Sequence, residues 1–180
     1  MGRLTIISGN IVSDEILALG DAIVLPTNPM MRCGAGVSGA IFAKAGVDDL
    51  EQYCEHTFGI SYYNEPGVNE MKVPDVRVTP GFKIPVKIIF AQGPKIWDYE
   101  DFDAALDLLL QTYKNVLQVS VDQGFRSILI PALGTGDYGF SHEDTAQPVI
   151  HLLRSFARGH NLNLFFVVLT HDIKVIYDQY

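Results

Sequence analysis

The stretch Ile130–Gly139, IPALGTGDYG, decides the fold because it joins a short apolar strand to a glycine-rich loop. The apolar run at residues 127–132 is typical of a strand that is buried on both faces, as in a parallel sheet. Glycine tolerates positive φ and lets the backbone approach a ligand closely, so Gly134–Gly139, named loop 2, predicts a binding loop. Ligands of such sheets bind beyond the carboxyl ends of the strands.

A second glycine-rich stretch, Cys33–Gly39 or CGAGVSG, is named loop 1. It follows an apolar strand at 22–25, after the segment 26–32, and leads into a helix that ends near Gly46. Free N–H groups and the dipole at a helix N-terminus favour phosphate. Loop 1 lacks the Gly-Lys-Ser/Thr of a Walker loop and does not follow its strand directly, as the dinucleotide fingerprint does. A tight turn packed on a strand would also explain loop 1 taken alone.

Strand and helix patterns alternate along the whole chain, with no repeat or linker. This alternation predicts one α/β domain, residues 1–180, built on a largely parallel sheet covered on both faces. Ser141 with Asp144 predicts a capped helix, and Pro148 is expected to kink that helix or to mark its first turn. The region 62–73 is rich in polar and turn residues and carries no clear pattern. We expect strands at 5–8, 22–25, 76–79, 86–91, 127–132 and 164–169, and further helices at 16–19, 48–57, 102–122, 141–159 and 172–180.

Composition restricts the function classes. The chain has 180 residues and 48% hydrophobic side chains, which suits a globular domain. A net charge of −8 disfavours nucleic acid as a partner, although backbone amides can still bind an anion locally. No apolar run reaches the ~18 residues of a membrane span. Cys33 and Cys54 lack metal-knuckle spacing and suggest reduced thiols in the cytoplasm. The histidines have no metal-ligand spacing either, so we expect neither a metal nor a cofactor.

Four collinear motifs resemble those of macro domains, the ADP-ribose-binding family. Loop 2 and its strand are similar to the family signature I-P-A-x-x-T-G-x-Y-G. Loop 1 is similar to the other signature, in which a strand leads to an Asn, here Asn28, and then to a glycine run. Gly9–Ile11 and Pro85–Pro94 resemble two further strand-end motifs. The resemblance implies a three-layer α/β/α fold with a mixed, mostly parallel central sheet. It also implies ADP-ribose or a derivative as ligand, with an ADP-ribosylated protein as a further partner.

The resemblance also assigns roles to residues. Tyr138 would pack on the distal ribose, while the amides of Gly134 to Tyr138 would hold the diphosphate. Asn28 would bond the ribose hydroxyls, because an amide both donates and accepts. In the family, an Asp at the position of Asn10 accepts a hydrogen bond from the adenine amino group. Asn in its place removes the charge assistance of that bond. His171 is placed to stack on the base. The predicted ligand-binding residues are Asn10, Ile11, Asn28, Gly34, Gly36, Val37, Ser38, Gly134, Thr135, Gly136, Asp137, Tyr138 and His171.

Several of these residues also fit structural roles. Asn28 lies between two prolines and can cap a turn, and Tyr138 can belong to the core. His171 can cap the last helix or lie on the surface. Asp137 can be a solvated loop carboxylate, and Cys33 a passive small residue. These alternatives stay open at the level of sequence.

Catalysis depends on which acid or nucleophile enters the site. One hydrolytic branch of the family has an Asp ten residues after the Asn, where this chain has Ser38, and a serine hydroxyl without a partner is no general base. Another branch uses a lysine, to be sought here at Lys83 or Lys87. The first hypothesis is therefore an ADP-ribose reader. The second is an ADP-ribosyl or O-acetyl-ADP-ribose hydrolase that uses Asn28 and Asp137. The third is a relative in fold only that binds another nucleotide or a protein, suggested by Asn10 and the segment 29–32.

Overall fold

The computed structural model describes residues 2–60 and 68–180. Part of the segment 62–73, which the sequence left without a clear pattern, lies outside these residues. The elements in chain order are β1 (Leu4–Ser8), α1 (Asp14–Leu17), β2 (Ala22–Pro26), α2 (Gly36–Ala45), α3 (Val47–Phe58), β3 (Val76–Thr79), β4 (Lys87–Ala91), η1 (Ile96–Asp98), α4 (Phe102–Asp122), β5 (Ser127–Pro131), α5 (His142–His160), β6 (Asn163–Val168) and α6 (His171–Asp178).

The six strands form one mixed sheet in the order β1-β6-β5-β2-β4-β3. The pairs β1·β6, β6·β5, β5·β2 and β2·β4 are parallel, and β3 alone runs antiparallel to its neighbour β4 at one edge. The carboxyl ends of five strands therefore meet on one rim. The predicted mixed, mostly parallel sheet is confirmed.

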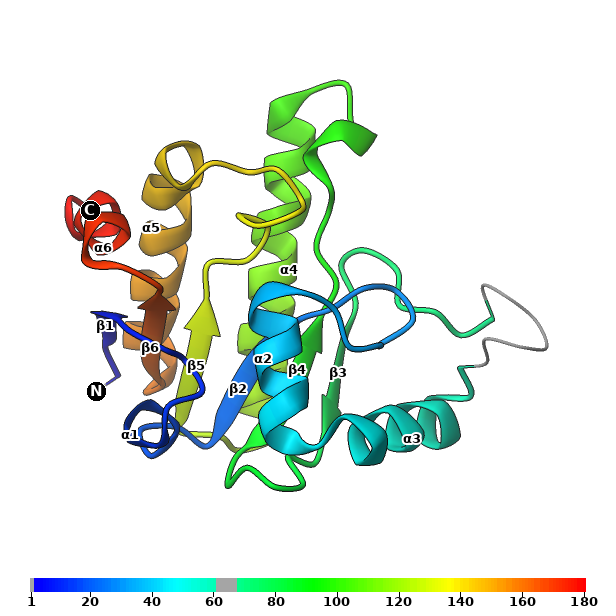
Figure 1. Cartoon of the computed structure of the whole chain (residues 1–180). Coiled ribbons are helices and arrows are strands. Elements are labelled where there is room, and N and C mark those ends of the chain that lie inside the picture. Colours follow the sequence, from blue (N-terminus) through cyan, green and yellow to red (C-terminus); the bar gives the residue numbers. More distant parts are fainter. Residues whose placement is uncertain (1, 61–67) are drawn as a thin grey trace.

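Side chains of the central strands alternate between two cores, as the period of a strand requires. In β2, Ala22 and Val24 belong to the core under α4, α5 and α6, while Ile23 and Leu25 belong to the core under α1, α2 and α3. Figure 1 shows α2 in front of the sheet and α4 behind it. Both faces of the sheet are thus covered, which gives the predicted three layers.

The helices begin and end where the sequence indicated. The Ser141 hydroxyl accepts from the Asp144 N–H at 3.1 Å and caps α5, as predicted. Helix α5 runs from His142 to His160 through Pro148, so Pro148 does not mark its first turn. The prediction of an alternating α/β domain holds to within two or three residues at most element ends.

Candidate functional site

The main cavity lies at the carboxyl ends of the parallel strands and has a volume of about 450 Å³. Pro26, Ala91, Pro131 and Val168, at the ends of β2, β4, β5 and β6, form part of its wall. Residues of loop 1 and of loop 2 both line the cavity. Both loops lie at the upper rim of the sheet in Figure 1. The volume is in the range of sites that bind molecules of nucleotide size.

Loop 1 feeds directly into the N-terminus of α2, which has ten residues. The N-cap residue is Ala35, whose side chain cannot accept a hydrogen bond. Among the described residues none accepts from the N–H groups of Gly36, Val37 or Ser38. All three residues line the cavity. These donors and the helix dipole make this wall favourable for an anion.

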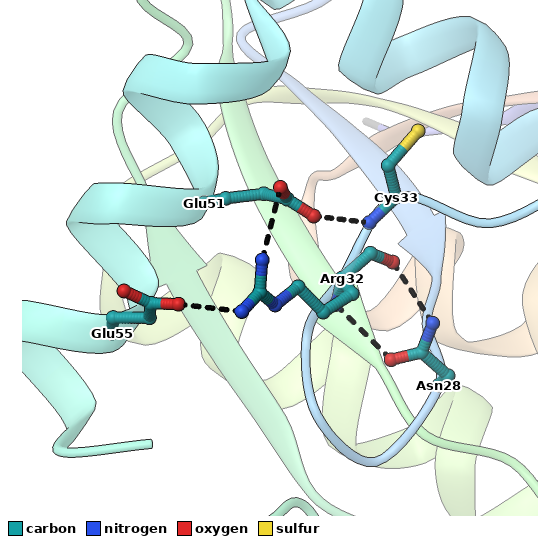
Figure 2. A network of polar contacts seen from close by, with 5 residues as sticks. All are labelled: Asn28, Arg32, Cys33, Glu51 and Glu55. Atoms are coloured by element: carbon teal, nitrogen blue, oxygen red, sulfur yellow. Dashed lines mark hydrogen bonds and ion pairs between the residues drawn. The ribbon is translucent and has the colours of Figure 1, made fainter. Parts of the chain in front are cut away.

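A polar network that starts at Asn28 on the cavity wall holds the entrance to loop 1 (Figure 2). Asn28 donates from Nδ2 to the Arg32 carbonyl at 2.9 Å and accepts at Oδ1 from the Arg32 N–H at 3.0 Å. The Arg32 guanidinium contacts Glu51 at 3.3 Å and Glu55 at 2.7 Å, both on α3. The second oxygen of Glu51 accepts from the Cys33 N–H at 3.0 Å. Glu51 therefore holds the backbone and a side chain of the same segment.

Ser38 has a buried hydroxyl on the cavity wall. Its residue is 6% exposed, and its Oγ has no hydrogen-bond partner among the described residues. A buried hydroxyl that has lost water without gaining a partner costs roughly 1–3 kcal/mol. A ligand that bonds Ser38 Oγ would remove this cost. Ser38 is thus suited to bind rather than to act as a base.

Loop 2 is a compact turn held mainly by its own backbone. The Phe140 N–H donates to the Gly134 carbonyl at 3.0 Å, and the Thr135 hydroxyl donates to the Ala132 carbonyl at 2.7 Å. Gly134 has φ +81°, and a Cβ there would lie 2.9 Å from the Phe140 ring. Both the conformation and the space therefore require glycine.

Five successive N–H groups of loop 2, those of residues 134 to 138, have no acceptor among the described residues. The N–H of Leu133, just before them, donates to the Tyr113 hydroxyl at 2.7 Å. Tyr113 is a fully buried residue of α4, and burial raises the pKa of its phenol well above the ordinary value. Unpaired amides in a turn form an anion-binding cradle. Loop 2 therefore offers such a cradle opposite the N-terminus of α2.

Tyr138 is fixed at both ends on the cavity wall. Its hydroxyl donates to the Thr27 carbonyl at 3.3 Å and accepts from Gln92 Nε2, also at 3.3 Å. Lys95 Nζ lies 5.5 Å from the ring centroid, within the range of a cation–π contact. The Ile96 N–H donates to the Tyr138 carbonyl. The ring is therefore held in place beside the cavity and needs no ligand to order it.

Comparison with known proteins identifies the family of this chain. The family model described as "Macro domain" matches residues 24–149. The chain belongs to the macro domain family. A protein named O-acetyl-ADP-ribose deacetylase from Citrobacter rodentium is 29% identical over 180 residues, 98% of this chain and 94% of that protein. A macrodomain of Oceanobacillus iheyensis with ADP is 28% identical at TM-score 0.84 over 99% of this chain and 89% of that chain. A mutant of the same macrodomain with ADPR is 29% identical at TM-score 0.84, and the match covers 99% of this chain and 91% of that chain.

This macro domain brings most of the predicted site residues to one cavity. Ten of the thirteen line it, namely Asn28, Gly34, Gly36, Val37, Ser38, Gly134, Thr135, Gly136, Asp137 and Tyr138. Asn28 also holds a turn, so the structural role and the cavity position coincide.

The other three predicted residues lie outside the described lining of the cavity. Asn10 is exposed in the turn after β1, and its Oδ1 accepts from the Val12 N–H at 3.1 Å. Ile11 is buried in the core under α1 to α3. His171 is the exposed first residue of α6, and the Thr170 hydroxyl caps that helix instead. The alternative of a surface position for His171 is therefore the one that the structure adopts.

Sequence reasoning missed part of the cavity wall. Leu169 and Ile173 line it just beyond the end of β6, and His142 lines it at the first residue of α5. The signal for His142 was its position directly after loop 2, and for Leu169 its position at a carboxyl strand end. Gln92 was missed as well, although it follows β4 and contacts Tyr138.

The lysines expected for a covalent mechanism lie away from this site. Lys87 opens β4 at the rim opposite to the cavity, and Lys83 packs against Gly46 at the end of α2. Asp137 is the one carboxylate among the described lining residues, and it is exposed. Within residues 2–60 and 68–180, no cluster of three His, Cys, Asp or Glu is arranged for a metal ion, and no helix is long and apolar enough to cross a membrane.

Proposed function

We propose that this macro domain binds ADP-ribose or an ADP-ribose derivative, free or linked to a protein, in the cavity between loops 1 and 2. The observation that carries the proposal is a pair of facing backbone cradles, the N-terminus of α2 and the amides of residues 134 to 138. No Lys or Arg occurs among the described residues that line the cavity. Amide donors can bind a diphosphate in a protein of net charge −8 without such side chains.

The side chains around the cradles suit a ribose. Tyr138 presents a fixed ring for packing, and Asn28 has one further N–H and one further lone pair beyond its two bonds to Arg32. Ser38 adds a hydroxyl that is unpaired among the described residues. Asn10 and His171 stay assigned to adenine and Ile11 to ligand binding, although none of the three belongs to the described lining of the cavity. The relatives support the ligand, since the O. iheyensis structures contain ADP and ADPR.

Isothermal titration calorimetry tests this function. We expect ADP-ribose to bind with one site and to bind more tightly than AMP, which lacks the second phosphate and the distal ribose. Heats equal to those of dilution for both ligands at high micromolar concentration would remove the proposal. ADP-ribose and AMP of equal affinity would restrict the site to one phosphate and a base.

The alternative function is hydrolysis of ADP-ribose from proteins or of O-acetyl-ADP-ribose. It is favoured by the relative named O-acetyl-ADP-ribose deacetylase, of which this chain covers 94%. Asp137 would act as the base and Asn28 would orient the substrate, because both line the cavity. The rate of product release by the wild type and by Asp137→Ala distinguishes a binding module from a hydrolase. A rate above background that falls in the variant supports an enzyme, and an unchanged rate rules out Asp137.

Three wider assignments belong to the same proposal. Residues 1–180 form one domain, which is supported by strands from residue 4 to residue 168 in one sheet. An ADP-ribosylated protein is a partner, and nucleic acid is not. The protein works in the cytoplasm, a location supported by two free cysteines. Pull-down with ADP-ribosylated and unmodified forms of one protein tests the partner, and cell fractionation tests the location.

A further inference from the structure

Two parts of the cavity wall differ in chemistry. One part carries the amides of the two loops that have no acceptor among the described residues. The other part is formed by Val168, Leu169 and Ile173, and Leu169 is 74% exposed although it is apolar. His142 brings an imidazole to the cavity from the start of α5. A nucleotide has the same polarity, with phosphates at one end and a flat, largely apolar base at the other.

The imidazole of His142 is held from the core side. Its Nδ1 lies 2.7 Å from the hydroxyl of Tyr177, and the two rings meet edge to face at 5.5 Å. Tyr177 is 1% exposed and packs on Phe166 of β6 with ring centroids 4.7 Å apart. One nitrogen of His142 is therefore engaged, which leaves Nε2 and the ring edge for the cavity.

The contact with Tyr177 bears on which nitrogen of this ring carries the proton. The Tyr177 hydroxyl is buried and has one hydrogen to donate, and His142 Nδ1 lies within hydrogen-bond distance of it. The hydroxyl of the nearby Thr145 donates to the Ser141 carbonyl at 2.8 Å. If Tyr177 donates to Nδ1, the neutral imidazole has its proton on Nε2. Burial lowers the pKa of His142 and so favours the neutral ring, although the charge of Glu143 acts in the opposite direction.

We infer that His142 is a specificity-determining residue whose Nε2–H donates to the base of the bound nucleotide, at an acceptor nitrogen or carbonyl oxygen. The base lies against the apolar wall of Leu169 and Ile173, and the phosphates lie in the amide cradles. This inference rests on the proposed function, because it takes the base to be part of the ligand. It adds a polar contact that distinguishes ligands with a base from those without one.

Two substitutions separate the nitrogens of His142. His142→Asn places an amide oxygen near the position of Nδ1 and keeps an acceptor for Tyr177, but it removes the donor at Nε2. His142→Gln places a side-chain amide near the position of Nε2, and the NH2 group of this amide can still donate to the base. We expect His142→Asn to lower the affinity for ADP-ribose about tenfold, and His142→Gln to stay within about threefold of the wild type. His151→Asn, at an exposed histidine of α5 outside the cavity lining, is the matched control and leaves affinity unchanged.

Ribose 5-phosphate, which has a sugar and a phosphate but no base, completes the experiment. We expect its affinity to be the same in the wild type and in His142→Asn. Equal losses for both ligands would assign His142 a general structural role and overturn the inference, as would an unchanged affinity for ADP-ribose. If the wild type itself does not bind ADP-ribose, the proposed function fails instead.

Nitrogen-15 NMR of the wild type gives a second readout that needs no variant. We expect His142 as the Nε2–H tautomer in the free protein, with a ligand-induced shift at Nε2 on addition of ADP-ribose and a smaller one on addition of ribose 5-phosphate. A proton on Nδ1, or equal shifts with the two ligands, would contradict the assignment.

Discussion

Loop 1 and loop 2 face each other across one cavity but are held in different ways. Loop 1 depends on side chains from elsewhere, since Arg32 and Cys33 are held by Glu51 and Glu55 of α3. Loop 2 holds itself through backbone turns, with one buried phenol, Tyr113, at its entrance. The comparison teaches that two similar glycine patterns can be ordered by distant ion pairs in one case and by local geometry in the other.

The largest effect is expected from a change inside the cradle of loop 2. Gly136→Glu puts a carboxylate among the free amides, and a Cβ at this exposed position meets no atom within 4 Å. We expect the fold to persist and ADP-ribose affinity to fall about a hundredfold or more, equivalent to roughly 2.7 kcal/mol. Calorimetry and thermal unfolding measure the two quantities.

Gly159→Glu is the matched control for this change. It adds the same charge at a glycine of α5 whose Cβ position is equally open. We expect the control to bind ADP-ribose like the wild type. Retained affinity in Gly136→Glu would show that loop 2 is not the phosphate site.

The second prediction concerns the anchor of loop 2. Tyr113→Phe removes the acceptor of the buried Leu133 N–H and leaves that donor without a partner. We expect the free energy of unfolding to fall by about 1–3 kcal/mol, measured by chemical denaturation. ADP-ribose affinity should fall as well, because loop 2 begins at the next residue. Tyr180→Phe, at the exposed C-terminal residue, serves as the control. Equal stabilities of the two variants would mean that loop 2 needs no anchor.

The third prediction tests the anchor of loop 1. Glu51→Ala removes contacts to the Arg32 side chain and the Cys33 amide together, while Glu55→Ala removes a contact to Arg32 alone. Exposed ion pairs contribute only ~0–1 kcal/mol, so the second change should matter little. We expect Glu51→Ala to lower ADP-ribose affinity about tenfold, and Glu55→Ala less than about threefold.

Glu51→Gln separates positioning from general stability. The amide oxygen of Gln can still accept from the Cys33 N–H, so we expect it to restore most of the affinity that Glu51→Ala loses. The anchoring role fails if Glu55→Ala costs as much affinity as Glu51→Ala. It also fails if both Glu51 variants bind like the wild type.

The same contrast explains what could be predicted from sequence. Loop 2 was predictable because its strand, its glycines and Tyr138 are contiguous, and the alternation of apolar runs gave the sheet. The anchors of loop 1 could not be predicted, since Arg32 meets Glu51 and Glu55 only after α3 folds back 19 and 23 residues along the chain. The contact between His142 and Tyr177 was missed for the same reason. His142 and Tyr177 meet from two helices, 35 residues apart.

The smallest effect is expected from the titration of His142. This residue follows loop 2 at the start of α5 and contacts Tyr177 of α6. Burial lowers its pKa below the ordinary value of 6.5, so the unfolded chain binds a proton more readily than the folded protein does. The stabilisation from keeping this ring neutral is therefore complete above pH 6.5 and is lost as the pH falls toward the folded pKa. Glu143 on α5 opposes the shift, and Tyr177 on α6 stays neutral because burial raises its pKa.

His142→Asn removes this titration while keeping an acceptor for Tyr177. We expect the difference in free energy of unfolding between the wild type and His142→Asn to be larger at about pH 7.5 than at about pH 5.5, by chemical denaturation. Gln147→Asn, at an exposed residue of the same helix that carries no titratable group, should show a difference that does not depend on pH. A pH-independent difference for His142→Asn would mean that His142 is solvated in the folded protein. The cavity wall at His142 would then be open to water, like the exposed Gly136 in loop 2.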